Sequence, residues 1–430
     1  MRQAVYAIGI MGLWLAIGQA GAIGQSISLP PVKSAATRLD RTHRSSMHLR
    51  LAEQAWHRAQ QETAAGETAP AIASLRQAAA IEPDWGDPLL LLGQLQMRAG
   101  QPNAALRSFI RLSEIEPRRA RGHLMIGMLF ARLRRMRRAE LEFRLAASAN
   151  PENPAAPFYL ALTQARRKEW TRAATTLQAM LQRWPAHLEA VRLLANVEAE
   201  QKHLNRALDA FSRAVQLAPS DPQSYIDLGN FYAANSYYHR ALSAYKRGLR
   251  RAREPDAIAA VRLAQAQAEH FLGRNRAALA SLQPLLAQPR ALALAGLCHQ
   301  ALGESAAAVA DYRALILQAP KDYRGYQLLA AQELQTGETQ RAARRLEQAL
   351  RLAPQDEPAH LELAQADWRL HQSAGAEHEI RAALALDPND AAAHYLLGRL
   401  LAAAGQIPAA QAEFATVKRL RAAQRNTKIH

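Results

Sequence analysis

The stretch "LLGQLQMRAGQPNAALRSFIRLSEIEP", Leu91 to Pro117, is apolar enough for a protein core, but a glycine interrupts it and a proline ends it. Starting 34 residues later, the chain reads "MIGMLFARLRRMRRAELEFRLAASANP", from Met125 to Pro151. Both stretches have a glycine near the start, a phenylalanine in the second half and a proline at the end. They are copies of one repeat, so repeats must be counted before domains are assigned.

Repeats of this kind cover most of the chain. They begin at residues 52, 86, 120, 154, 188 and 222, and then at residues 259, 289, 323, 357 and 391. The seventh repeat starts three residues late and the eighth follows four residues early. The seventh also has Gln265 and Arg290 where leucine and proline recur elsewhere. We therefore expect eleven repeats with a local irregularity, such as a kink, at the seventh.

Two columns of the repeat predict a packed pair of helices. Position 20 is always alanine: Ala71, Ala105, Ala139, Ala173, Ala207, Ala241, Ala278, Ala308, Ala342, Ala376 and Ala410. Position 24 is always bulky: Leu75, Phe109, Phe143, Leu177, Phe211, Tyr245, Leu282, Tyr312, Leu346, Ile380 and Phe414. The two positions lie one helical turn apart on the same face, as in a buried stripe. An invariant alanine indicates that two helices approach too closely for a larger side chain.

Two further columns predict where the helices end. Position 32 is proline in most repeats, for example at Pro117, and should end the second helix. Position 15 is often glycine: Gly66, Gly100, Gly273, Gly303, Gly337 and Gly405. A left-handed residue there would close the first helix.

Together these columns resemble the tetratricopeptide repeat, over roughly Ala52 to Arg421. The resemblance implies an all-α fold, a single right-handed α-solenoid of about eleven stacked helix-turn-helix repeats. One repeat cannot bury its own apolar face, so stability comes from stacking on neighbours. Residues 422–430 are predicted to be a C-terminal tail.

The first 22 residues, "MRQAVYAIGIMGLWLAIGQAGA", contain one arginine, an uncharged apolar run and a final Ala-Gly-Ala. This is the layout of a secretory signal peptide, and the run is short for a membrane span of about 20 residues. We expect cleavage after Ala22 and a mature protein, beginning at Ile23, that is periplasmic or secreted. The alternative is an uncleaved anchor in the inner membrane. Residues 23–51, rich in Ser, Arg and Pro, are predicted to be a linker.

No motif for catalysis is present. The sequence contains no GxxxxGK[ST], HExxH or GxSxG pattern, and its 14 histidines are scattered. His371 and His378 lie seven residues apart without a third ligand beside them. Cys298, the single cysteine, is expected to be a buried, inert thiol. We predict no enzymatic activity, no cofactor and no metal site.

The resemblance implies that ligands bind a concave groove lined by the first helices. Position 9 of those helices is a side-chain amide in six repeats: Gln60, Gln94, Asn196, Asn230, Gln267 and Gln365. Amides donate and accept hydrogen bonds, so a row of them could pair with an extended peptide backbone. Alternatively, they are ordinary solvent-facing residues.

Arg192 with Asn196, followed by Asn230, is similar to half of the two-carboxylate clamp by which some family members hold a peptide C-terminus. The clamp's other half requires Lys and Arg in the next repeat. This sequence has Leu263 and Gln267 at those positions. We therefore do not predict recognition of a C-terminal carboxylate.

Charge gives the stronger prediction. The formal net charge is +17, and residues 86–187 alone hold 17 Lys+Arg against 7 Asp+Glu, whereas residues 323–418 hold 9 against 12. Position 13 is arginine in three consecutive repeats, at Arg98, Arg132 and Arg166, with Arg121 nearby. Guanidinium groups suit carboxylate or phosphate oxygens, so we predict a row that faces an anionic ligand. Alternatively, the row is a solvated basic face in which each arginine finds a local carboxylate such as Glu169.

Two functions remain open. The first is an exported, non-enzymatic scaffold that binds protein segments, with acidic groups, and assembles a bacterial cell-envelope complex. The second is a periplasmic superhelix that guides an anionic exopolysaccharide, for which exposed aromatics such as Trp56, Phe158, Trp368 and Tyr395 would be needed. An exported protein seldom meets nucleic acid, so that partner is not expected. The basic region could also contact a membrane surface.

Overall fold

A computed structural model describes residues 46–426 of the chain. The predicted signal peptide, most of the predicted linker and the last four residues lie outside this range. Within it the chain forms 22 α-helices and two short 3-10 helices, without a strand. The prediction of an all-α helical repeat solenoid is confirmed.

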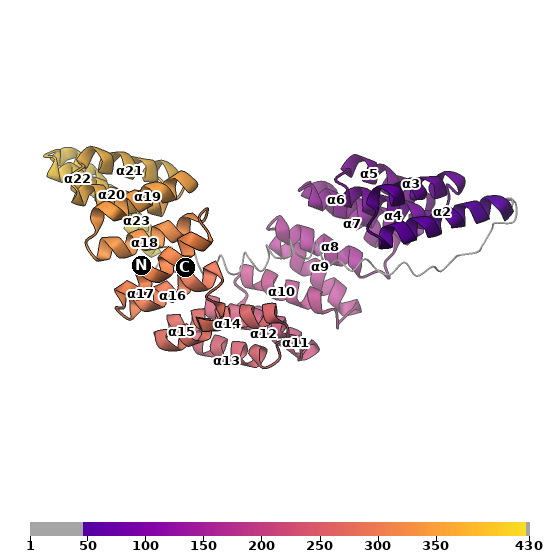
Figure 1. Ribbon diagram of the computed structural model, residues 1–430, viewed down its shortest axis with the longest axis horizontal. Helices are drawn as coiled ribbons and strands as arrows, with labels where there is room; N and C mark the ends of the chain where they lie inside the picture. Colours follow the sequence, from indigo (N-terminus) through magenta and orange to yellow (C-terminus); the bar gives the residue numbers. More distant parts are fainter. Residues whose placement is uncertain (1–45, 427–430) are drawn as a thin grey trace. The chain divides into compact units, whose positions relative to one another are not determined.

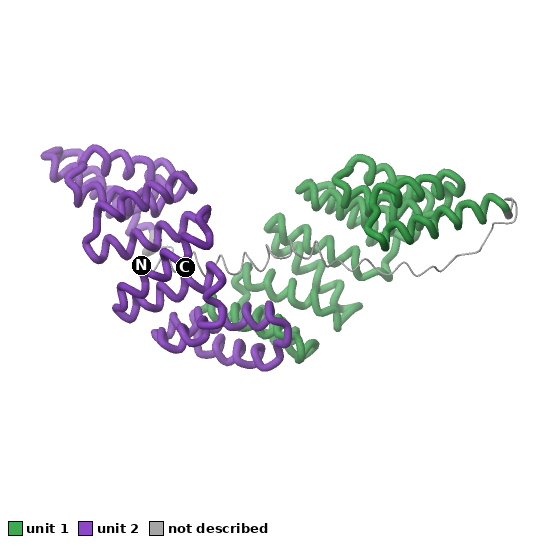
Figure 2. Tube along the Cα trace, viewed as in Figure 1, with its two compact units in different colours: residues 1–235 green, residues 236–430 purple. Residues whose placement is uncertain are grey.

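The chain divides into two compact units, residues 1–235 and 236–430 (Figure 2). The division falls inside the sixth repeat, and each unit is described by itself. In unit 1 each helix packs on the next one along the chain, so that the first and second helices of successive repeats alternate (Figure 1). Its helices are α2 (Ser46–Ala64), α3 (Thr68–Ile81), α4 (Gly86–Arg98), α5 (Pro102–Ile115), η2 (Pro117–Arg119), α6 (Arg121–Arg132), α7 (Met136–Ala149), α8 (Ala155–Arg166), α9 (Trp170–Arg183), α10 (Leu188–Glu200), α11 (Leu204–Leu217) and α12 (Pro222–Ala234).

Unit 2 follows the same packing order and contains the irregular seventh repeat. Its helices are α13 (Tyr238–Leu249), α14 (Pro255–Phe271), α15 (Asn275–Leu282), η3 (Gln283–Leu285), α16 (Pro289–Ala301), α17 (Ser305–Gln318), α18 (Tyr323–Gln335), α19 (Thr339–Leu352), α20 (Glu357–Arg369), α21 (Ser373–Leu386), α22 (Ala391–Ala403) and α23 (Ile407–Asn426). The predicted irregularity is confirmed, because α15 has only 8 residues and passes directly into a 3-10 turn.

Both packing columns take the predicted places. All eleven alanines of position 20 are buried, and none is more than 2% exposed. At position 24 the bulky side chain is at most 2% exposed in ten repeats, the exception being Phe414. Position 15 is left-handed in all eleven repeats, at the six predicted glycines and at Arg134, Lys168, Lys202, Ser236 and His371.

Position 8 of the first helix explains how the bulky column fits. Position 8 is glycine in five of the six repeats whose position 24 is aromatic, the exception being Ala195 with Phe211. In four of the five, a methyl group added to that glycine would overlap the ring. A Cβ on Gly93 would lie 2.3 Å from Phe109, and one on Gly296 would lie 2.3 Å from Tyr312. In these repeats the first helix contacts the ring through its backbone, at a distance that leaves no room for a Cβ unless the ring shifts.

Two predicted boundaries are corrected by the helices. The linker was predicted to reach residue 51, but α2 begins at Ser46, so the first helix is a turn and a half longer than its repeat requires. The tail was predicted from residue 422, but α23 continues to Asn426. In residues 46–426, none of the helices is both long enough and apolar enough to cross a membrane.

Candidate ligand-binding face

Three arginines of unit 1 occupy equivalent places along the array. Arg98, Arg132 and Arg166 are the last residues of α4, α6 and α8, and all three are exposed. None of them forms an ion pair with a carboxylate of residues 46–426. Desolvation by the surrounding protein lowers the pKa of the Arg166 guanidinium, although its side chain stays exposed. The arrangement leaves three guanidinium groups available to an external anion.

Arg121 does not extend this row. Its guanidinium contacts Glu116 at 2.6 Å and Asp87 of the preceding repeat at 2.7 Å. Desolvation alone would lower the pKa of Arg121, but the hydrogen bonds and charges of these two carboxylates raise it. Arg121 therefore links two repeats, and the expectation that it belongs to an anion-binding face is corrected.

Glu169, the carboxylate expected to pair with the row, forms its ion pairs with other arginines. Glu169 pairs with Arg167 at 2.7 Å and with Arg172 at 2.6 Å. The buried Glu140 pairs with the same two arginines and with Arg144. A buried carboxylate that holds several guanidinium groups stabilises the α7–α8–α9 packing, and neither Glu140 nor Glu169 pairs with Arg166.

The half clamp is also closed by an internal ion pair. Arg192 lies 2.6 Å from Asp227, which is 9% exposed, and Nε donates a second hydrogen bond to the same carboxylate at 2.7 Å. Burial raises the pKa of Asp227 and outweighs the opposing effect of Arg192. Asn196 donates to the backbone carbonyl of Arg192 at 3.0 Å. Both polar side chains of the half clamp are thus engaged by groups of the chain itself.

The amide column does not form one continuous row. Gln60 and Gln267 are exposed, Asn230 is half-buried, and Gln94 is buried with its amide 3.9 Å from the Met125 sulfur. An amide that already has a partner inside the protein is poorly placed to bind a peptide backbone.

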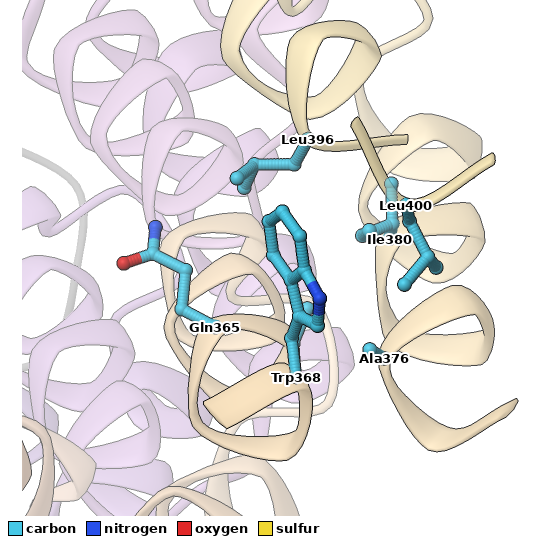
Figure 3. A pocket seen from close by; sticks show the side chains of 7 residues that line it. Gln365, Trp368, Ala376, Ile380, Leu396 and Leu400 are labelled. Carbon is cyan, nitrogen blue, oxygen red and sulfur yellow. The ribbon is translucent and has the colours of Figure 1, made fainter. Parts of the chain in front are cut away.

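The four aromatic residues are mostly engaged in packing. Trp56 is buried against Trp85, with ring centroids 5.5 Å apart. In unit 2, the guanidinium of Arg399 lies 4.5 Å from the centre of the Trp368 ring. The Trp368 indole also closes a hollow between α20, α21 and α22 that leaves no space for a water molecule (Figure 3). Only Tyr395 of the four is exposed.

A histidine–carboxylate pair that the sequence did not lead us to expect recurs at one place in three repeats. His123–Glu142, His360–Glu379 and His394–Glu413 are each 19 residues apart, with Nδ1–Oε2 distances of 2.8, 2.5 and 2.5 Å. Each pair joins position 4 of the repeat, in the first helix, to position 23, in the second helix. The constant spacing of 19 residues between histidine and glutamate could have predicted these pairs.

Cys298 is buried as predicted, and burial raises the pKa of its thiol to about 12. In residues 46–426 no three potential metal ligands converge.

Comparison with known families identifies three stretches of the chain. Family models described as tetratricopeptide repeat match residues 62–129, 158–222 and 380–412. No curated protein matches the chain.

Three solved structures are similar at low identity. The human IFIT1 dimer with PPP-AAAA is 15% identical, and the match covers 79% of this chain and 91% of that chain at a TM-score of 0.43. The APC/C hetero-tetramer Cut9–Hcn1 is 15% identical, with 81% and 90% covered, also at 0.43. A tetratricopeptide repeat protein from Parabacteroides merdae is 16% identical, with 58% and 99% covered, at 0.46. Family models match three separate stretches and the same columns continue between them, so the chain contains tetratricopeptide repeats.

Proposed function

We propose that this protein is a non-enzymatic interaction scaffold and that unit 1 binds acidic protein segments along Arg98, Arg132 and Arg166. The observation that carries the proposal is the recurrence of an exposed arginine, without a carboxylate partner among residues 46–426, at position 13 of three consecutive repeats. Arg121, Arg167, Arg172 and Arg192 are all paired with carboxylates, whereas the three arginines of the row have none among residues 46–426. An unpaired row of guanidinium groups, repeated at one position, suits a chain of carboxylates.

The backbone beside the row supports the proposal. Arg134 and Lys168 lie two residues after Arg132 and Arg166, in left-handed conformations with φ of 57° and 61°. Such a conformation costs a non-glycine residue about 1–2 kcal/mol, and glycine is used at this position in six other repeats. Basic side chains are therefore present where backbone energetics favour glycine, which is expected when the charge itself has a function.

The finer proposal is that the scaffold is exported and assembles a bacterial cell-envelope complex. It rests on the composition of residues 1–22, which lie outside the described range. Sequencing of the protein purified from cell envelopes should find Ile23 as the first residue; an intact Met1 would contradict cleavage. A polysaccharide ligand has less support, because three of the four candidate aromatic side chains are packed against their neighbours.

A charge-matched pair of variants tests the basic row. In the first variant Arg98, Arg132 and Arg166 are changed to glutamine. In the control the changes are Arg76→Gln, Arg107→Gln and Arg137→Gln, three exposed arginines on second helices of unit 1. Both lose three positive charges, so only their placement differs.

The probe is a labelled synthetic peptide of alternating glutamate and serine, titrated with the full chain at low and high salt. The row variant should bind about tenfold more weakly at low salt, with a flatter salt dependence, while the control stays close to the original protein. Equal weakening in both variants would reduce the row to a contribution to net charge. Cross-linking in intact cells then identifies the natural partner, which should be lost from the row variant alone.

A further inference from the structure

The first helix α2 and the last helix α23 differ in the polarity of the side that faces solvent. The first helix α2 has Gln54 and Gln61 at positions 3 and 10, and both are exposed. In the later repeats these positions are mostly small or apolar, because they face the second helix of the preceding repeat. Terminal repeats of a solenoid need such a polar outer side. In residues 46–426, the outer side of α2 is therefore polar at the two positions that face a preceding repeat elsewhere.

The last second helix, α23, lacks that polar side. Phe414 is 37% exposed, whereas position 24 is 0–2% exposed in every preceding repeat. Its ring still packs beneath its own first helix, since a Cβ on Gly398 would lie 2.7 Å from it, as at Gly93, Gly127 and Gly296. The exposed side of Phe414 is thus the side that a following first helix covers elsewhere.

Inside the array, the covering helix has a constant pattern. Phe109 shares a core cluster with Ile126 and Leu129 of the next repeat, and Ile380 shares one with Leu397 and Leu400. These are positions 7 and 10 of the following first helix. Position 3 of that helix is small where it meets position 28 of the preceding repeat. A Cβ on Gly122, for example, would lie 2.5 Å from Ser113.

Charge indicates what could cover Phe414. At the α5–α6 junction, Glu116 at position 31 pairs with Arg121 at position 2 of the next repeat. In the last repeat position 31 is Arg421, and position 28 is Lys418; both are exposed and have no carboxylate partner among residues 46–426. Glu116 caps the end of α5, whereas Arg421 lies inside α23, which continues to Asn426. The end of the last repeat thus presents positive charge where the α5–α6 junction has a carboxylate.

A second copy of the chain fits this face poorly. The sequence of α23 contains a single acidic residue, Glu413, which already pairs with His394, so two copies of α23 would bring like charges together. Stacking on α2 of another copy would place Arg58 and Gln61 where positions 7 and 10 must be apolar.

We propose that the C-terminal face, made of Phe414, Lys418 and Arg421, binds an amphipathic helix of a protein partner in the place of a following first helix. The partner helix has an acidic residue in its first turn and a small residue directly after it. Apolar residues follow four and seven positions beyond the small one. This site is separate from the basic row of unit 1, so either can fail without the other.

The test uses a peptide built from the chain's own pattern. A labelled peptide with the sequence of residues 388–404 carries small Ala393 and apolar Leu397 and Leu400 at the required spacing. It is made with Ala392→Glu and, as a charge control, with Ala392→Lys. Fluorescence anisotropy with the full chain should give saturable binding of the Glu peptide, about fivefold tighter than that of the Lys peptide.

Two protein variants locate the effect. Arg421→Glu should reverse the preference between the two peptides. Arg419→Glu is the matched control, because position 29 is exposed in each of the preceding repeats with regular second helices and so points away from a following helix. Binding no stronger than that of a scrambled peptide, or equal effects of both variants, would overturn the proposal. So would sedimentation evidence for a dimer that Arg421→Glu dissociates, since the face would then belong to a second copy.

Discussion

In both units a left-handed residue at position 15 ends the first helix of each repeat, but the residue type at that position differs between the units. In unit 1 three consecutive repeats have Arg134, Lys168 and Lys202, with φ between 57° and 63°. In unit 2 the corresponding run is Gly273, Gly303 and Gly337, with φ between 72° and 84°. Glycine adopts this conformation without a steric penalty. The repeat therefore tolerates basic residues at a backbone cost, and unit 1 is where they accumulate.

Two glutamates, Glu140 of unit 1 and Glu362 of unit 2, show the difference in charge between the units. Glu140 in unit 1 is buried but surrounded by three arginines. In unit 2, burial and the nearby Asp356 raise the pKa of Glu362 to about 7, and burial with Asp390 does the same for Glu357. Repeats with the same packing columns can thus differ in the charges around their buried carboxylates. The packing columns occupy one side of each helix, so the residues on the other sides are free to vary.

The largest expected effect tests whether the packing is equivalent in both units. Ala139→Phe in unit 1 and Ala342→Phe in unit 2 each place a large side chain at a fully buried position. Each should lower the free energy of unfolding by about 1–3 kcal/mol, because the helix pair becomes overpacked. Urea denaturation should also become less cooperative as neighbouring repeats loosen.

Leu141→Phe is the control for this pair, since Leu141 is 56% exposed on the same helix as Ala139. An unchanged denaturation curve for either alanine variant would show that the column does not pack equivalently in the two units.

The next effect tests the role of charge in unit 1. Glu140→Gln keeps the shape of the side chain but removes the charge that three arginines share. We expect a loss of about 2 kcal/mol in the free energy of unfolding, since the guanidinium groups are left without their buried counter-charge. High salt should reduce the loss only slightly, because the carboxylate is buried. A neutral result would mean that solvent satisfies the arginines equally well.

The opposite result is expected for a carboxylate of unit 2. The pKa of Glu362 is about 7 in the folded chain against 4.5 for the free group, so the folded state holds its proton more tightly. The contribution of Glu362 to the free energy of unfolding is therefore fully present below about pH 4.5 and is lost as the pH rises through 7. Glu362→Gln removes this loss. Relative to the original protein, the variant should gain about 1 kcal/mol at pH 8 and little at pH 5. A gain that is the same at both pH values would contradict the raised pKa.

The smallest expected effect concerns the left-handed residues themselves. Arg134→Gly should raise the free energy of unfolding by about 0.5 kcal/mol, because relief of backbone strain exceeds the added freedom of the unfolded chain. The reciprocal change, Gly337→Arg in unit 2, should lower it by a similar amount. If the basic side chain at Arg134 serves binding, the glycine variant will be more stable yet bind the acidic peptide more weakly.

Much of the fold could be predicted because each repeat makes the same contacts. Alanine at position 20 and a bulky residue at position 24 recur in all eleven repeats, and the burial of these side chains confirms the predicted packing. The six glycines of position 15 predicted the left-handed turn, and five other residues adopt it at the same place. The basic row was visible for the same reason, since Arg98, Arg132 and Arg166 share one position.

Features that occur once could not be predicted in this way. Arg121 and Arg166 are both arginines of first helices, but only Arg121 has two carboxylates within reach. That difference depends on where neighbouring side chains meet in space, because ion pairs form across repeats rather than within a local pattern. The coupling of Gly93 to the Phe109 ring, by contrast, recurs in other repeats, and it becomes visible in the sequence only when positions 8 and 24 are compared with each other.

The sequence by itself determined the repeat, its two-helix form and the turn that divides it, because a contact made eleven times leaves a period in the chain. The tertiary structure alone decided which charges are neutralised and which surface stays open. Phe414 has the same residue type and position as Phe109, yet one is 37% exposed and the other is fully buried. Exposure depends on what packs against a side chain, and that neighbour is set by the place of the repeat in the array rather than by the repeat itself.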